Sequence, residues 1–373
     1  MTIYAKAGFH NDVDARLLTA EVDGEYLVFE GQQVLTPRHE ALLSMLLIST
    51  MKAGVELQLD RQTTVDGLWK ANAEKAMQKS AQWWQLNHYE LMIESGMSEI
   101  PSEGKRGVGL FFTGGVDSAY SLCVNRGKVT HLINVQGLDI PLNDHQRQEQ
   151  TNELLAQIAE RESLELLQVR TNIRDMRLFN AAPWSITHGG VLGGIAHLFS
   201  RSLETVLIAS SNVPGPYGSH PELDPLWSSS ALNVVYDTPG VKRLDKVRRI
   251  AKEPYLVDLL KVCWENRATD LNCGICEKCV RTQCELAAAG VEAPASFPKG
   301  NLVARVDDLA EFKPHFKEQW NDIQRSVSSD ELQNAIARLS QRSLAAGGQS
   351  RVQRLYRKTK AILASRADKM STL

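Results

Sequence analysis

The sequence has little net charge and no long hydrophobic run. Its 42 lysine and arginine residues are nearly balanced by 44 aspartate and glutamate residues, which leaves a formal charge of −2 at pH 7. The overall composition therefore does not indicate a nucleic-acid-binding protein. The longest apolar run near the front, ALLSMLLIST, starts at Ala41; it is too short to cross a bilayer and lies too far along the chain for a signal peptide. We expect a cytoplasmic protein without a membrane span.

Cysteine is also scarce, and its distribution argues against a disulfide framework. Of six cysteines, five fall within the 22 residues from Cys263 to Cys284, whereas the cysteines of a secreted, disulfide-bonded domain are spread along the chain. Four of the five follow the spacing C-x9-C-x2-C-x2-C, which can close a tetrahedral metal site. We predict a structural Zn²⁺ ion, with an iron–sulfur cluster as the alternative. The predicted ligands are Cys263, Cys273, Cys276 and Cys279. Cys284 and Cys123 are predicted to be buried free thiols.

Short apolar segments alternate with helical segments from residue 107 onward. The predicted strands are VGLFF, HLINVQG, LELLQV, TVLIAS and LNVVYD, and the predicted helices fall at 117–125, 143–163, 185–202 and 241–253. This alternation is typical of an α/β fold in which a parallel sheet is covered by helices on both faces. In such folds ligands bind at the carboxyl ends of the strands, in the loops that lead to helices.

The length of 373 residues suits two domains, or one domain with extensions. We predict an N-terminal extension domain of unassigned role at 1–100, a catalytic domain with the cysteine site at 105–300, and a helical C-terminal region at 301–373. The last 28 residues hold seven basic residues and one acidic residue. This tail is either a solvated basic segment or a contact for a polyanion. A second copy of the chain, in a homodimer, is a further candidate partner.

The stretch FFTGGVDSAYSL joins the first predicted strand to a helix. Two adjacent glycines let the backbone turn sharply and let its amides approach an anion. The helix that follows adds N-terminal amides and the positive end of its dipole, and Thr113 and Ser118 add hydroxyl donors. These features predict a phosphate site. The loop is neither a Walker A motif, because G-K-[ST] is missing, nor the G-x-G-x-x-G of dinucleotide-binding folds.

Residues 113–118, Thr-Gly-Gly-Val-Asp-Ser, resemble the S-G-G-x-D-S signature of the PP-loop ATP pyrophosphatases, with a threonine as the first residue. The resemblance implies a HUP-like parallel sheet and a loop that holds pyrophosphate when ATP adenylates a substrate. It implies ATP and Mg²⁺ as cofactors, with an aspartate that assists the metal or the helix cap. The implied ATP-binding residues are Thr113, Gly114, Gly115, Asp117 and Ser118.

A second motif narrows the resemblance. Cys273-Gly-Ile-Cys-Glu-Lys-Cys-Val-Arg281, preceded by Cys263, is similar to the tail motif of the 7-cyano-7-deazaguanine synthase family. That family converts a carboxy-deazaguanine and ammonia into a nitrile through an adenylated acid. The resemblance covers about residues 105–290. It also implies a lysine beside the ATP phosphates, for which Lys246 is the best match and Lys242 the second.

The substrate side of the resemblance is weaker. Where the family has G-Y-P-D-C-R, this chain has Ser-His-Pro-Glu-Leu-Asp at 219–224, so that Asp224 stands in the place of an arginine. A reversed charge near an anionic carboxylate is costly when the contact is buried. We therefore predict the same chemistry on an altered substrate, with His220, Glu222 and Asp224 as candidate contacts. His188, at the start of a glycine-rich helix, is a further candidate, although close helix–sheet packing also explains its neighbouring glycines.

The predicted function is an ATP-dependent ligase that forms a C–N bond. It would activate a small-molecule acid, such as a 7-deazaguanine-type acid of a queuosine-like biosynthesis, as an acyl adenylate and release pyrophosphate. Ammonia or an amine would then attack. Asp117, Ser118 and Lys246 are the predicted catalytic residues. Two alternatives stay open: a PP-loop sulfurtransferase that thiolates RNA and binds it in a salt-sensitive way, and a nucleotide-binding module without catalysis.

Overall fold

A computed structural model gives the structure of the chain and describes residues 4–10, 15–59, 64–96, 106–211, 215–267 and 270–347. The basic tail that the sequence predicts lies almost wholly outside the described residues, at 348–373. None of the helices in the described ranges combines the length and the apolar character that crossing a membrane requires.

The described residues form one nine-stranded sheet in the order β11-β10-β7-β8-β9-β3-β2-β1-β4. Its strands are β1 (Tyr4–Phe9), β2 (Ala15–Val22), β3 (Glu25–Leu35), β4 (Glu56–Gln58), β7 (Gly107–Phe111), β8 (His131–Gln136), β9 (Glu165–Thr171), β10 (Leu203–Ala209) and β11 (Asn233–Asp237). Two short strands, β5 (Thr64–Asp66) and β6 (Glu94–Gly96), pair separately. The five strands from β11 to β9 are mutually parallel and coincide with the five apolar segments expected from the sequence, which confirms an α/β fold with a mostly parallel sheet.

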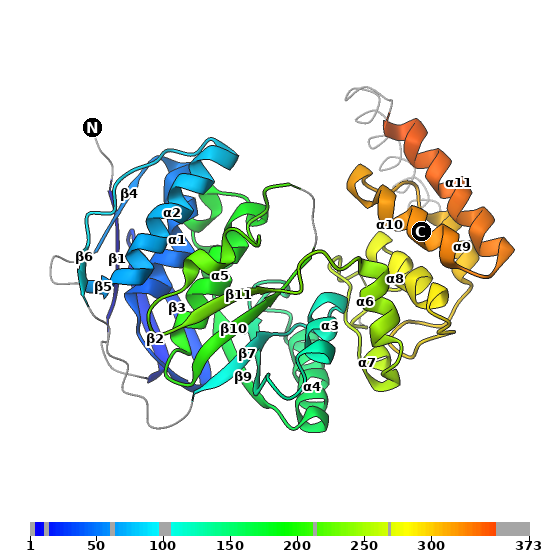
Figure 1. Cartoon of the computed structure of the whole chain (residues 1–373), viewed down its shortest axis with the longest axis horizontal. Coiled ribbons are helices and arrows are strands. Elements are labelled where there is room, and N and C mark those ends of the chain that lie inside the picture. Colours follow the sequence, from blue (N-terminus) through cyan, green and yellow to red (C-terminus); the bar gives the residue numbers. More distant parts are fainter. Residues whose placement is uncertain are drawn as a thin grey trace, which may run out of the picture.

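Helices cover the parallel part of the sheet on both faces (Figure 1). The longer helices are α1 (His39–Ala53), α2 (Gly67–Trp84), α3 (Val116–Val124), α4 (His145–Glu162), α5 (Trp184–Leu198), α6 (Arg243–Ile250), α8 (Glu277–Ala288), α10 (Lys317–Ser326) and α11 (Asp330–Gly347). The shorter ones are α7 (Pro254–Asp258), α9 (Leu302–Asp308) and the 3₁₀ turns η1 (Ile173–Asp175), η2 (Phe179–Ala181), η3 (Asp224–Trp227) and η4 (Pro314–Phe316). Neighbouring strand residues point to opposite faces, so Phe111 packs with α1 and α5, whereas Leu110 and Phe112 pack with α3 and α4.

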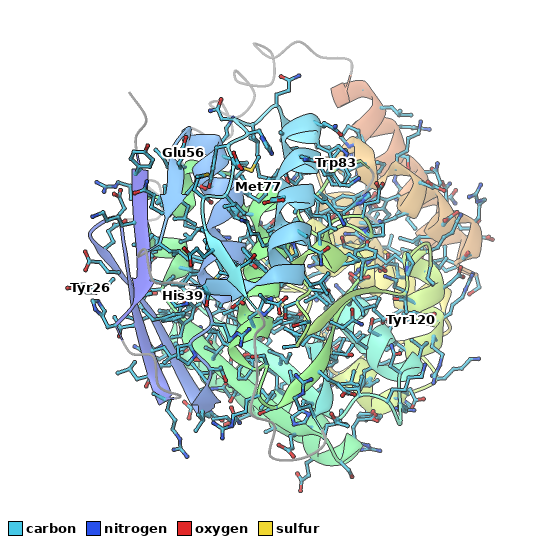
Figure 2. The ribbon with its side chains drawn as sticks, turned by 60° about the vertical axis from the view of Figure 1, so that its left-hand side comes forward. Tyr26, His39, Glu56, Met77, Trp83 and Tyr120 are labelled. Carbon is cyan, nitrogen blue, oxygen red and sulfur yellow. The ribbon has the colours of Figure 1, made fainter. Side chains whose placement is uncertain are left out.

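The N-terminal hundred residues extend this sheet. Strand β3 pairs antiparallel with β9, and β2 and β1 follow it outward. Side chains of β1–β3, α1 and α2 belong to the same buried core as those of α5 and β10, so the boundary predicted near residue 100 does not separate two hydrophobic cores. The opposite face of these strands carries exposed side chains, including Tyr26, labelled at the left edge of Figure 2.

Helices α1 and α5 pack closely because α5 carries four glycines. A Cβ added to Gly190 would lie 2.4 Å from the backbone oxygen of Ser44, and one added to Gly194 would lie 2.4 Å from that of Ala41, both on α1. At Gly193 the same atom would lie 2.6 Å from Cβ of Trp227. The glycine-rich start that the sequence shows thus serves helix packing.

Replacing Gly190 by alanine is expected to lower the free energy of unfolding by about 2–3 kcal/mol, because the new methyl group overpacks a helix–helix contact formed by rigid backbone. Urea unfolding measures this loss. Gly8→Ala is the matched control, since nothing lies within 4 Å of a Cβ added there. Equal stability of the two variants would contradict the close approach of α1 and α5.

The C-terminal helices α8–α11 surround a third buried core that includes Trp320, Ile323 and Ile336. They lie at the opposite end of the molecule from β1 and β4 (Figure 1). Helix α8 contributes to this core through Val280 and Cys284, while its first turn carries Cys279 of the cysteine cluster. One helix therefore joins the C-terminal helices to the predicted metal site.

Candidate functional site

The glycine loop lies where the order of the sheet reverses. From β7 the chain moves through α3 to β8 and through α4 to β9, and then returns through α5 to β10 on the other side of β7. Parallel sheets bind ligands at such a switch point, because the loops at the carboxyl ends of the two central strands diverge there. Gly114 has φ +78°, a backbone conformation that glycine adopts without strain.

A cavity of about 260 Å³ opens at this point. Thr113 and residues 115–118, from the glycine loop and the first turn of α3, line one side, so the N-terminal amides of a nine-residue helix lie beside the cavity. Gly114 is not among the lining residues and packs against Lys261 instead. The other walls are apolar, apart from a few polar groups: Asp139, His188, Arg243 and Lys278. The structure thus brings the predicted residues Thr113, Gly115, Asp117 and Ser118 together with a predicted substrate residue, His188.

Asp117 is held by two cations. Its Oδ1 accepts a hydrogen bond from Lys246 Nζ at 2.9 Å, and its Oδ2 lies 3.6 Å from an Arg243 guanidinium nitrogen. Burial alone would raise the pKa of this carboxyl, but the charges of Arg243 and Lys246 outweigh that effect and lower it. Asp117 is therefore a carboxylate whose negative charge is already balanced by the protein.

Lys246 positions Asp117 rather than facing a ligand. Its side chain is 1% exposed, and its ammonium group donates to Asp117 Oδ1 and to the carbonyl and hydroxyl oxygens of Ser210. An ammonium group has three hydrogens, so these three acceptors occupy it fully. The ring of Tyr120, labelled in Figure 2, lies 6.0 Å from Nζ. Lys242, the second candidate, is exposed and pairs with Glu318 and Asp322 instead.

Two lysines that the sequence analysis did not single out lie at the site. Lys278 lines the cavity, and Lys261 packs against Gly114, whose carbonyl accepts a 2.8 Å hydrogen bond from the Lys261 amide. Burial lowers the pKa of both. Neither ammonium group has a hydrogen-bond acceptor in the part of the chain that the structure describes; Lys278 lies 5.3 Å from the ring of Trp264. In the sequence, the feature that could have indicated these two lysines as site residues is their position next to the predicted metal ligands.

A row of alternating buried charges links the cavity to α8. Arg243 donates to both carboxylate oxygens of Glu285, at 3.1 and 3.0 Å. Glu285 also lies 3.6 Å from Arg281, which in turn pairs with Glu277 at 2.8 Å. Arg281 is the final residue of the cysteine motif, and its side chain is 3% exposed. These pairs fix Arg243 between Asp117 and Glu285 and hold it at the cavity wall.

The four predicted metal ligands form one buried cluster. Their sulfur atoms all lie within 4.8 Å of one another, and the Cys263–Cys276 and Cys273–Cys279 Sγ pairs are 3.9 Å apart. Tetrahedral zinc with Zn–S bonds of about 2.3 Å requires sulfur atoms about 3.8 Å apart, so this donor set fits the metal. Hydrogen bonding from the Cys279 thiol lowers the pKa of Cys276 to about 6, which favours a thiolate. The group can therefore bind a metal such as zinc.

The other two cysteines lie outside this cluster. Cys284 is fully buried in the C-terminal core, and Cys123 is buried beneath the sheet, as predicted. Burial raises the pKa of Cys123 to about 11. Both are therefore held as protonated thiols at neutral pH.

His188 lies among aromatic rings at the cavity wall. Its ring centroid is 4.7 Å from that of Tyr217 and 5.6 Å from that of Trp184. Burial lowers its pKa to about 4, so the imidazole is neutral at pH 7. Nδ1 lies 3.0 Å from the Trp184 carbonyl oxygen, which can only accept a hydrogen bond. Nδ1 therefore carries the proton, and Nε2 is left as an acceptor.

The remaining substrate candidates do not reach this cavity. Glu222 is exposed and pairs with Lys79, and His220 lines a neighbouring cavity and contacts Trp83, labelled in Figure 2. Asp224 is fully buried: it accepts hydrogen bonds from the Ser219 hydroxyl at 2.6 Å and from the His220 amide at 3.2 Å. Asp224 thus closes the turn before η3, and the geometry does not support a direct contact between Asp224 or Glu222 and a substrate in the cavity.

Burial raises the pKa of Asp224 from 3.8 to about 7. Between these values the unfolded chain releases the proton while the folded protein keeps it, so wild-type stability falls as the pH rises. Asp224→Asn removes this loss. The variant is expected to gain stability relative to wild type between pH 4 and pH 8, by up to about 4 kcal/mol.

Urea unfolding at the two pH values measures this gain. Asp245→Asn, which removes an exposed carboxylate, is the matched control. The same stability difference between Asp224→Asn and wild type at both pH values would contradict a raised pKa of Asp224 in the folded protein.

Comparison of the chain with protein-family models, with curated proteins and with solved structures gives no match. Evidence for function therefore comes from the geometry of the site. That geometry combines backbone amides, buried cations and a carboxylate at one end of a largely apolar cavity.

Proposed function

We propose that the chain is an ATP-dependent adenylating ligase of the PP-loop type, similar to the 7-cyano-7-deazaguanine synthase family. It would activate a carboxylic acid as an acyl adenylate, release pyrophosphate and pass the acyl group to ammonia or an amine. The observation that carries the proposal is the convergence of the glycine loop, the N-terminus of α3 and the cations Arg243 and Lys278 on one cavity. Such a set of fixed donors stabilises a departing polyphosphate.

The protein would contribute mainly orientation and fixed charge. The amides at Gly115 and in the first turn of α3 would bind phosphate oxygens, and Ser118 and Thr113 would add hydroxyl donors. Arg243 and Lys278 would neutralise the charge that builds up on pyrophosphate as it leaves. Asp117, one of the two carboxylates that line the cavity with Asp139, would help to hold Mg²⁺, which would supply further charge neutralisation when bound. Lys246 would act through Asp117, as a positioning residue.

The apolar half of the cavity suits the acid to be activated. Trp184, Leu138 and Val135 form its walls, and the neutral imidazole of His188 offers an acceptor nitrogen. An uncharged acceptor can orient an N–H group of a substrate without attracting its carboxylate. The carboxylate would then be directed toward the cations and the glycine loop.

The burial of the cysteines supports adenylation over sulfur transfer to RNA. A sulfurtransferase needs a reactive thiol or an open cluster position, whereas all six cysteines of this chain are buried and four are gathered at one site. A non-catalytic nucleotide-binding module would use the same cavity. Only a measurement of turnover distinguishes it from a ligase.

The test is exchange of labelled pyrophosphate into ATP and pyrophosphate release, measured with Mg²⁺, ammonia and 7-carboxy-7-deazaguanine, and with other heterocyclic acids. Exchange that depends on an acid, and that falls by about a hundredfold or more in Asp117→Asn, is the expected result. Asp245→Asn, with an exposed carboxylate removed from α6, is the matched control. ATP binding without acid-dependent exchange would favour the binding module, and salt-sensitive RNA binding would favour the sulfurtransferase.

A further inference from the structure

The segments that carry the four clustered cysteines also carry Lys261 and Lys278, whose ammonium groups have no hydrogen-bond acceptor among the described residues. Lys278 lies between Cys276 and Cys279, and Lys261 lies two residues before Cys263. Lys278 lines the cavity, and Lys261 is a buried side chain packed against Gly114. The cysteine site therefore lies within the part of the chain that brings Lys278 to the cavity and packs Lys261 against the glycine loop.

Backbone contacts make this connection direct. The Lys261 amide donates to the Gly114 carbonyl at 2.8 Å. Asn272, adjacent to Cys273, is 1% exposed: its Oδ1 accepts from the amides of Val262 and Cys263, and its Nδ2 donates to the Leu260 and Ser296 carbonyls. The segment leading to the first cysteine is thereby hydrogen-bonded both to the residue before the second cysteine and to the glycine loop.

The position of Lys278 depends on the same cluster. Helix α8 begins at Glu277, so Lys278 lies in its first turn, where backbone amides lack intrahelical partners and helices fray. This turn is flanked by Cys276 and Cys279, both in the cluster, and Glu277 makes an ion pair with Arg281 one turn further on. A metal ion bound by the two cysteines would hold this turn, and Lys278 with it, against the cavity.

We propose that the metal-loaded cysteine site positions Lys278 as an anion-binding residue of the cavity, so that metal binding and polyphosphate binding strengthen each other. The inference rests on the proposed function in one respect, that the cavity binds a polyphosphate. If the metal strengthens polyphosphate binding by some factor, polyphosphate strengthens metal binding by the same factor, because linkage is reciprocal.

The experiment uses the full-length, zinc-loaded protein and inorganic pyrophosphate with Mg²⁺. Calorimetry gives the pyrophosphate Kd, and a chromogenic chelator gives the rate of zinc release with and without pyrophosphate. Pyrophosphate is expected to slow zinc release from the wild type by about fivefold or more. Free pyrophosphate also binds zinc, which would speed up zinc release rather than slow it. Lys278→Met is expected to weaken pyrophosphate binding about tenfold and to abolish the protection of zinc.

Lys278→Arg, which keeps the cation, is expected to restore much of both effects, and Lys252→Met, with an exposed lysine removed after α6, is expected to behave as wild type. Pyrophosphate binding with an unchanged zinc release rate, or with Lys278→Met equal to wild type, would overturn the inference and leave the ligase proposal intact. A wild-type protein that binds no pyrophosphate would overturn both. Protected zinc without any acid-dependent exchange would support the inference and count against the ligase alone.

Discussion

Lys246→Met is expected to lower the free energy of unfolding by about 3–5 kcal/mol, because it leaves part of a buried ion pair without its partner. The Lys246 ammonium is 2.9 Å from Asp117 Oδ1 and also satisfies two oxygens of Ser210. Without it, Asp117 would keep its ion pair with Arg243, at 3.6 Å, and the pKa of Asp117 would rise. Chemical denaturation at pH 7 measures the loss of stability.

The matched control for this experiment is Lys252→Met, which removes an exposed lysine near the end of the same helix and should change stability by less than about 0.5 kcal/mol. Lowering the pH should narrow the gap between Lys246→Met and wild type, since protonation of Asp117 removes the unpaired charge. A Lys246→Met protein as stable as the control would show that Lys246 is free in solution and available to a ligand.

Loss of the metal is expected to have the second large effect. Cys276→Ser should reduce the bound metal from about one equivalent to nearly none and lower the thermal midpoint by about 10 °C or more, since structural metal sites contribute much of the folding free energy around them. The affected region is the segment from Lys261 to Phe297, several of whose buried side chains, among them Val262, Leu286 and Phe297, share a core with side chains of α3 and α4. Elemental analysis and differential scanning calorimetry measure the two quantities.

Cys284→Ala is the control for the cysteine experiment, because Cys284 is buried but lies outside the four-cysteine group. It should keep the metal and lose about 1 kcal/mol or a little more, as expected for a small buried group. Full metal content in Cys276→Ser would contradict this prediction and mean that the other three cysteines are enough to bind the metal. Elemental analysis also separates zinc from an iron–sulfur cluster, which would add visible absorbance.

The fold of residues 107–253 could be predicted from the sequence because each strand there is a short apolar run, and such runs form the buried strands of parallel sheets. The N-terminal strands could not be predicted in the same way. Residues of β1–β3 are buried on one face only and have an exposed opposite face, so their pattern is diluted by polar residues. The pairing of β3 with β9, more than a hundred residues further along the chain, has no local signature.

Some residues of the site could likewise be predicted from local motifs, whereas others depend on the fold. The glycine loop and the cysteine spacing are local motifs, and the structure brings their residues together as expected. The roles of the basic residues at α6 depend on which side of the helix faces Asp117. Lys246 is buried and supports Asp117, Arg243 lies at the cavity wall, and Lys242 forms an ion pair at the surface. The substrate candidates at 220–224 lie outside the cavity because Asp224 accepts a hydrogen bond from Ser219, His220 packs on Trp83 and Glu222 pairs with Lys79.

Neighbouring residues were enough to predict the parallel strands, the loop that turns at Gly114 and the four thiols that can share a metal. The cations at the cavity could be identified only from the folded chain, because Arg243 and Lys278 come from separate segments that meet there. A charge acts through space over a few ångströms, so its role depends on the packing around it and not on its place in the chain.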